Sequence, residues 1–126
     1  MRLLLALAAI SGFLAVALGA FGAHGLQSKL ADLPDAARRL EWWRTGASYH
    51  LAHALAMGLA ALVTERIAGR APFVAGYAFL LGTLLFSGSL YAMTVTGVRV
   101  LGAVTPFGGL AFLVGWAALA WAALRG

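Results

Sequence analysis

Residues 71–98 read APFVAGYAFLLGTLLFSGSLYAMTVTGV, a run of 28 residues without a formal charge. An α-helix rises about 1.5 Å per residue, so roughly 20 apolar residues cross the hydrocarbon core of a bilayer. Three further stretches of the 126-residue chain reach that length without a charge, residues 3–23, 45–64 and 100–124. The sequence therefore predicts an all-α integral membrane protein with four transmembrane helices.

The composition agrees with this interpretation. Hydrophobic residues make up 63% of the chain and charged residues only 10%, which is typical of a protein solvated by lipid. We expect one transmembrane domain over residues 1–126. The net charge of +5 comes from basic residues that flank the apolar runs, where Lys and Arg orient helices and meet lipid headgroups. Membrane lipids are therefore the expected partners, and nucleic acid is not.

Caps and turns narrow the four spans. Pro72 can start the third helix, and Gly97 interrupts a run that is too long for one crossing. Thr105 followed by Pro106 is typical of a cap and a first helical turn. The first run is longer than the 7–15 residues usual for a signal-peptide core, so we keep it as a span. The expected helices cover about residues 3–23, 45–64, 72–94 and 106–124.

One substantial polar segment separates the first two runs. Pro34 suits a first helical turn, and two neighbouring aspartates place negative charge near that helix N-terminus. Apolar side chains recur there at helical spacing: Leu33, Ala36, Ala37, Leu40 and Trp43. We predict a short amphipathic helix at about residues 33–44 that lies in the membrane interface, anchored by Trp42 and Trp43. A solvated loop is the alternative.

Small residues form stripes on the first and last helices. Such stripes let helix backbones approach closely, which is a usual route to association within lipid. The stripe residues are Ala8, Gly12, Ala15, Gly19 and Gly22 in the first helix, and Gly108, Ala111, Gly115, Ala118 and Ala122 in the last. Packing inside one bundle and a homo-oligomeric interface both remain open.

Polar residues gather at one end of the predicted bundle. Four spans place both termini and the 65–70 turn on one membrane face, and the 24–44 and 94–104 segments on the other. Nearly every unusual polar residue falls toward the second face. Ionisable groups within membranes are costly and mark functional sites. The candidate ligand-binding residues are His24, Tyr49, His53, Ser87, Ser89, Arg99 and Thr105.

Three histidines belong to this end of the chain. His50 and His53 are three residues apart on one helical face, and His24 arrives from the neighbouring helix. Three imidazoles suit a transition metal, and two from facing helices suit haem. No carboxylate, thiolate or methionine obviously completes such a site. We therefore expect hydrogen-bonded histidines without a metal or other cofactor, with His53 neutral and in one polar network with Arg99.

The serines of the third run do not complete a catalytic arrangement. Ser87 and Ser89 lack a carboxylate in the apolar spans that would orient a histidine base, and no G-x-S-x-G elbow is present. Phosphate-loop and dinucleotide fingerprints are also missing. We expect that the protein is not an enzyme.

Five ordered motifs resemble a known family. They are residues 19–24 (GAFGAH), Tyr49-His50-x-x-His53, residues 85–91 (LFSGSLY), Arg99-x-Leu101-Gly102 and Thr105-Pro106-x-Gly108-Gly109. The chain resembles the YgdD-like inner-membrane proteins, domain-of-unknown-function family 423. This resemblance implies a small, multi-pass bacterial inner-membrane protein without an assigned activity. In that family the position of His50 is often Gln, which argues against a metal site at His50 and His53.

Charge alone does not orient the bundle, because four basic residues flank the face of the termini and five flank the other. Similar family members have basic C-terminal tails, which implies cytoplasmic termini under the positive-inside rule. The leading functional hypothesis is a non-enzymatic scaffold or accessory protein whose partner is another membrane protein or a second copy. The alternative is a small-molecule or proton-linked binding or transport protein that uses the polar cluster.

Overall fold

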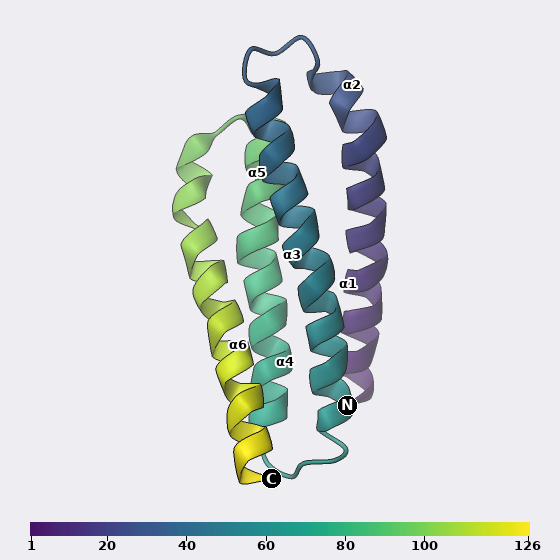
Figure 1. Ribbon diagram of the computed structural model, residues 1–126, viewed down its shortest axis with the longest axis vertical. Coiled ribbons are helices and arrows are strands. Elements are labelled where there is room, and N and C mark those ends of the chain that lie inside the picture. The colour runs from purple at the N-terminus through teal and green to yellow at the C-terminus, as the bar shows by residue number, and fades with distance from the viewer.

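The computed structural model describes all 126 residues as four long helical segments in an up-and-down bundle (Figure 1). The four segments are long and apolar enough to cross a membrane, which confirms the predicted fold class. The helices are α1 (Arg2–Phe21), α2 (Gln27–Leu30), α3 (Ala36–Val63), α4 (Ala71–Gly82), α5 (Gly88–Thr96) and α6 (Thr105–Arg125). Two π-helical turns, η1 (Gly22–Leu26) and η2 (Thr83–Ser87), join α1 to α2 and α4 to α5, and a 3₁₀ turn, η3 (Arg99–Ala103), precedes α6.

The two ends of the bundle differ in what they carry. The N-terminus, the C-terminus and the turn between α3 and α4 lie together at the bottom of Figure 1, and we call this the terminal end. The α2–α3 loop and the α5–α6 connection lie at the opposite end, which we call the loop end. All four segments run the full height between the two ends, as the four uncharged runs predict.

The prediction of a separate interfacial helix is wrong. Helix α3 begins at Ala36 and runs unbroken to Val63, so residues 36–44 form its first turns. Trp43 is only 4% exposed and donates a hydrogen bond from Nε1 to the Leu18 carbonyl oxygen, 2.7 Å away. The apolar face therefore packs on protein instead of lipid. Gly46 lies between the polar turns and the apolar run but does not interrupt the helix. It is buried and lets α3 approach α5 closely.

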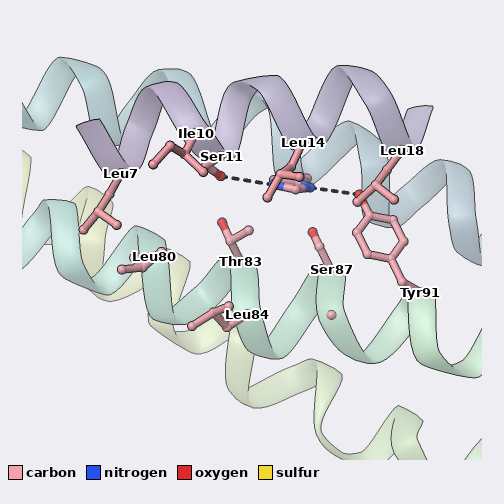
Figure 2. A pocket seen from close by; sticks show the side chains of 12 residues that line it. Leu7, Ile10, Ser11, Leu14, Leu18, Leu80, Thr83, Leu84, Ser87 and Tyr91 are labelled. Carbon is pink, nitrogen blue, oxygen red and sulfur yellow. Dashed lines mark hydrogen bonds between the residues drawn. The ribbon is translucent and has the colours of Figure 1, made fainter. Parts of the chain in front are cut away.

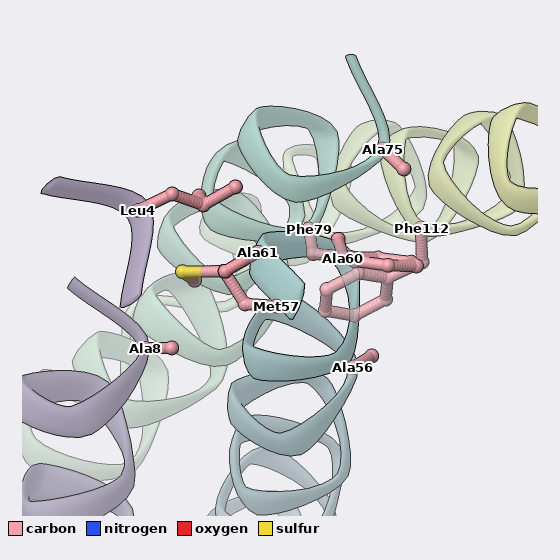
Figure 3. Close-up of a cluster of buried hydrophobic side chains, with 9 residues drawn as sticks. All are labelled: Leu4, Ala8, Ala56, Met57, Ala60, Ala61, Ala75, Phe79 and Phe112. Carbon is pink, nitrogen blue, oxygen red and sulfur yellow. The ribbon is translucent and has the colours of Figure 1, made fainter. Parts of the chain in front are cut away.

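A hydrophobic core fills the terminal end (Figure 3). Phe79 is completely buried in it, and small side chains bring the helices close around it. A Cβ atom at Gly76 would collide with Leu4, and one at Gly115 would collide with the Phe79 ring. The core consists of Leu4, Ala8, Ala56, Met57, Ala60, Ala61, Ala75, Phe79 and Phe112.

Both small-residue stripes are used inside the bundle. A Cβ atom at Gly12 would lie 3.9 Å from Ala54 on α3, and one at Gly22 would overlap the Trp43 ring. On α6, Gly108 lies directly against the backbone of Phe86. The stripes therefore pack α1 on α3 and α6 on the α4–α5 segment, and of the two interpretations the structure favours packing within one bundle.

Candidate functional site

His50 is the centre of a chain of three polar side chains that joins three helices. Its Nδ1 lies 3.0 Å from the Tyr91 hydroxyl on α5, and its Nε2 lies 3.0 Å from the Ser11 hydroxyl on α1. A neutral imidazole donates from one nitrogen and accepts at the other, and a hydroxyl can take either role. His50 is buried, and Ser11 lies near the middle of an uncharged run. Both ring nitrogens are thus satisfied where lipid offers no partner.

A groove of about 250 Å³ runs beside this chain, between α1 and the α4–α5 segment, and is partly open at the side of the bundle. Figure 2 shows the hydroxyls of Thr83 and Ser87 pointing from the opposite wall toward the line from Ser11 to Tyr91. We call it the His50 groove. Leucine and isoleucine side chains form the rest of its wall: Leu7, Ile10, Leu14, Leu18, Leu80 and Leu84.

The wall hydroxyls keep acceptor capacity for a guest. Thr83 donates its hydroxyl hydrogen to the Phe79 carbonyl oxygen at 2.9 Å, and Ser87 donates to the Gly46 carbonyl oxygen at 2.7 Å. Each hydroxyl oxygen still has lone pairs. These two residues are the first and last of the π-helical turn η2, and such turns occur frequently at functional sites. The groove therefore offers hydrogen-bonding groups without a charge.

His53 turns toward α6, away from this groove. Its Nδ1 donates to the Tyr49 carbonyl oxygen at 2.9 Å, and its Nε2 accepts from the Trp116 indole Nε1 at 3.1 Å. The ring stacks on Phe112 with a centroid separation of 3.6 Å. Because a carbonyl only accepts and an indole N–H only donates, the contacts fit the neutral tautomer protonated at Nδ1. His50 and His53 share a helical face, as their spacing predicts, but they serve different helix interfaces and do not form one site.

The remaining sequence-predicted residues do not converge. Ser89 and Thr105 join α5 to α6 through hydroxyl oxygens 2.6 Å apart, while the Tyr49 ring packs on Phe86 and is 45% exposed. His24, within η1, and Arg99, the first residue of η3, are exposed. No group of three metal-ligating side chains is present.

The predicted network of His53 with Arg99 is wrong, because the hydrogen bonds of His53 go to Tyr49 and Trp116. Arg99 opens the 3₁₀ turn η3, beyond the end of the third segment. At that position its guanidinium reaches water or headgroups and needs no acceptor inside the bundle. Tyr49 alone of the proposed network members touches His53.

Sequence reasoning missed Ser11, His50, Thr83 and Tyr91 as members of a site. His50 was set aside because the resembling family often has Gln there, and single hydroxyls in apolar helices attract little attention. One signal was available. Thr83, Ser87 and Tyr91 recur every four residues, which places them on one face of a helix.

Comparisons with known proteins agree with this architecture. The family model described as "Protein of unknown function (DUF423)" matches residues 18–109. The UPF0382 membrane protein YwdK of Bacillus subtilis is 42% identical over 126 residues, covering 99% of this chain and 98% of its own. The UPF0382 inner membrane protein YgdD of Escherichia coli is 45% identical over 126 residues, covering 98% of this chain and 91% of its own. No solved structure matches. The chain therefore belongs to the DUF423 family of membrane proteins, whose function is unknown.

Proposed function

We propose that this protein is a non-enzymatic accessory protein of the bacterial inner membrane that holds a lipid-soluble, hydrogen-bonding molecule in the His50 groove. The observation that carries the proposal is the row of polar side chains along a partly open apolar groove whose rim includes the exposed Ile10, Leu14 and Leu84. Polar groups inside a membrane are costly and mark binding sites. The small-molecule alternative inferred from the sequence thus moves from His53 and Arg99 to the His50 groove.

The chemistry of the wall defines the class of guest. No charged side chain lines the groove, so a charged guest would be buried without a counterion. Both nitrogens of His50 are occupied, so a guest hydroxyl or carbonyl would bond to the hydroxyls of Ser11 and Tyr91, which keep lone pairs and, on whichever of the two accepts from His50, a free O–H donor. A cavity of about 250 Å³ holds only the polar end of a lipid-sized molecule. The occupant is therefore a neutral alcohol or ketone whose apolar tail lies against the leucines and the bilayer.

The surroundings of His50 suit binding better than catalysis. A histidine base in a catalytic triad is oriented by a carboxylate, whereas both nitrogens of His50 face hydroxyls. The apolar spans contain no Asp or Glu that would replace them. Hydrogen bonding to a neutral guest is the chemistry that remains.

Filling the groove tests this proposal. A Cβ atom at Gly88, which lines the groove, would meet no atom within 4 Å, so Gly88→Leu adds bulk without a collision at Cβ. The probe is a long-chain alcohol carrying a photoactivatable diazirine, added to the protein in nanodiscs. We expect wild-type protein to be labelled at groove peptides and Gly88→Leu to lose most of that labelling.

Gly19→Leu is the matched control, because Gly19 also has open space at Cβ but lies outside the groove. Its labelling should equal that of wild type. Tyr91→Phe should weaken labelling by removing one hydroxyl while keeping the ring. Equal labelling of wild type and Gly88→Leu would contradict the proposal.

We also propose that both termini are cytoplasmic, from the basic tails implied by the family resemblance. Single cysteines suit this cysteine-free chain, and Ser28→Cys and Ala68→Cys place them at opposite ends of the bundle. Ala68 is preferred to Gly69, whose φ of +108° disfavours a side chain. An impermeant maleimide should label Ser28→Cys in intact spheroplasts and spare Ala68→Cys. The reverse pattern would invert the orientation.

A second copy of this chain or another membrane protein remains the proposed protein partner. Since both small-residue stripes pack inside the bundle, such a partner would contact lipid-facing side chains instead. Cross-linking in native membranes, followed by mass determination in mild detergent, measures the assembly. A monomer under both conditions would contradict a homo-oligomer.

A further inference from the structure

A second concave feature lies at the loop end and shares no lining residue with the His50 groove. It is an open basin of about 690 Å³, which we call the arginine basin. Residues of the first turns of α3 and the first residue of η3 meet there, although they are far apart in the sequence. The lining includes Arg38, Arg39, Arg99, Asp35 and Leu33.

Arg39 is the fixed wall of the basin. Its Nε lies 3.1 Å from both carboxylate oxygens of Asp35, and its Nη1 donates to the Thr94 carbonyl oxygen at 3.3 Å. Thr94 returns a hydrogen bond from its hydroxyl to the Arg39 carbonyl oxygen at 3.0 Å. The guanidinium also covers Gly97, where a Cβ atom would collide with it. Arg39 thus clasps α3 to the end of α5 and cannot swing away freely.

The positive charges of Arg38 and Arg99 are not neutralised by any carboxylate of the chain. Arg39 with Asp35 is the only ion pair in the chain, and both Arg38 and Arg99 are exposed without a protein acceptor. The hydrogen bond from Arg39 lowers the pKa of Asp35 below its usual range, with a smaller contribution from the charge of Arg99, so this carboxylate is ionised at neutral pH. Three guanidiniums and one carboxylate leave the basin with two positive charges.

Bringing like charges together is unfavourable unless an anion lies between them. Guanidiniums bind phosphate oxygens with paired, charge-assisted hydrogen bonds. The basin stands just outside the uncharged runs, at the depth where lipid headgroups lie, and exposed Leu33 forms part of its wall. We propose that the arginine basin binds a phosphate group between Arg38 and Arg99, with Arg39 as its rigid support. The phosphate belongs to a lipid headgroup or to a soluble phosphate ester.

The test measures lipid selectivity in phosphatidylcholine bilayers. Trace spin-labelled phosphatidylglycerol reports the fraction of lipid immobilised by the protein, and spin-labelled phosphatidylcholine is the reference. Wild-type protein should prefer phosphatidylglycerol. Arg38→Gln with Arg99→Gln should reduce that preference at least about fivefold, since each interfacial basic residue contributes about that factor.

Lys29→Gln with Arg44→Gln is the matched control, because it removes two positive charges at the same end of the bundle but outside the basin. This control loses only the general surface charge of two residues, so it should retain clearly more of the preference than the basin variant. Equal losses in the two double variants would reduce the effect to general surface charge and would overturn the proposal, as would an unchanged basin variant.

Inorganic phosphate at constant ionic strength identifies the source of the phosphate. If a lipid headgroup is the ligand, added phosphate leaves the immobilised phosphatidylglycerol in place. If a soluble ester is the ligand, added phosphate displaces the immobilised phosphatidylglycerol from wild type and control. Phosphate should then bind the basin variant at least about fivefold more weakly than wild type. Phosphate binding that is equal in all three proteins, without lipid selectivity, would overturn the proposal in both forms.

Discussion

The terminal end and the loop end are held together by different interactions. At the terminal end, four helices pack through alanines, glycines and a fully buried Phe79, and the hydrogen bond from Trp116 to His53 lies at the edge of this core. From the middle of the bundle toward the loop end, side-chain hydrogen bonds between helices are more numerous and involve Ser11, Arg39, Trp43, His50, Ser87, Ser89 and Thr94.

The difference shows how one bundle divides two tasks. Close packing of small residues holds helices together in lipid without needing polar groups. Polar side chains can then be confined to the half where the groove and the basin lie, at the depth where each finds a partner. Substitutions confined to one half should therefore differ in size and in kind, and four such tests follow from the largest expected effect to the smallest.

The largest effect is expected in the packed half. Gly115→Ala places a methyl group against the buried Phe79 ring, and overpacking of this kind reduces the free energy of unfolding by about 1–3 kcal/mol. Unfolding in mixed detergent micelles measures it. Gly109→Ala on the same helix is the control, since its Cβ would lie 3.9 Å from Phe86 in ordinary contact. Because Gly→Ala raises helix propensity in both variants, an equal loss of stability in the two would contradict the overpacking explanation.

A smaller effect is expected from the polar chain in the groove. His50→Leu removes the bonds to Ser11 and Tyr91, and interhelical bonds in membranes average about 0.6 kcal/mol, so we expect a loss of about 1 kcal/mol. The same unfolding assay applies. His24→Leu, at an exposed position without a hydrogen bond, should leave stability unchanged. A His50→Leu protein more stable than wild type would mean that the chain is maintained for binding at the expense of stability.

The next prediction tests the single hydrogen bond between Trp116 and His53. Trp116→Phe keeps an aromatic ring but removes the indole donor to His53 Nε2, which should reduce stability by about 0.6 kcal/mol. Trp121→Phe, whose indole makes no hydrogen bond, is the control. In a double-mutant cycle with His53→Leu, the Trp116→Phe effect should disappear. Additive losses would contradict the assigned bond.

The smallest effect is expected at the partly buried Asp35. Its hydrogen bond from Arg39 lowers its folded-state pKa below the ordinary value of 3.8. The carboxylate therefore contributes stability above that pH, and the contribution is lost as the pH falls through 3.8 to the folded pKa. Asp35→Asn should flatten the acid limb of the pH profile of thermal unfolding, whereas Asp32→Asn should keep the wild-type shape. Identical profiles for wild type and Asp35→Asn would contradict a contribution of the Asp35–Arg39 pair to stability.

The sequence predicted the number of spans and their approximate limits, because charge-free length is a property of one helix at a time. It placed the second helix at residues 45–64, whereas α3 extends from Ala36 to Val63. The pattern around Leu40 and Trp43 is amphipathic in either case. An apolar helix face does not indicate whether lipid or another helix covers it, and here α1 and α5 do.

The site was harder to predict for the same reason. The sequence predicted a polar cluster toward one end, but it paired His53 with Arg99 instead of Trp116. Residues 50 and 53 are only about 60° apart around a helix axis, and whether they share one environment depends on where the neighbouring helices lie. That placement follows from close contacts such as Gly108 on Phe86, which have no signature beyond a glycine.

Because α3 is longer than the hydrocarbon core is thick, the protein projects further into one aqueous phase than into the other. Its 28 residues span about 42 Å, more than the roughly 30 Å of hydrocarbon. At the terminal end, α3 ends at Val63 and Glu65 follows the uncharged run directly, so no charged turn of α3 extends beyond the apolar run there. The surplus turns all emerge on the other side, carrying Arg38, Arg39 and Glu41. The charged first turns of α3 are thus accessible to a protease, an antibody or a water-soluble ligand from one face of the membrane only.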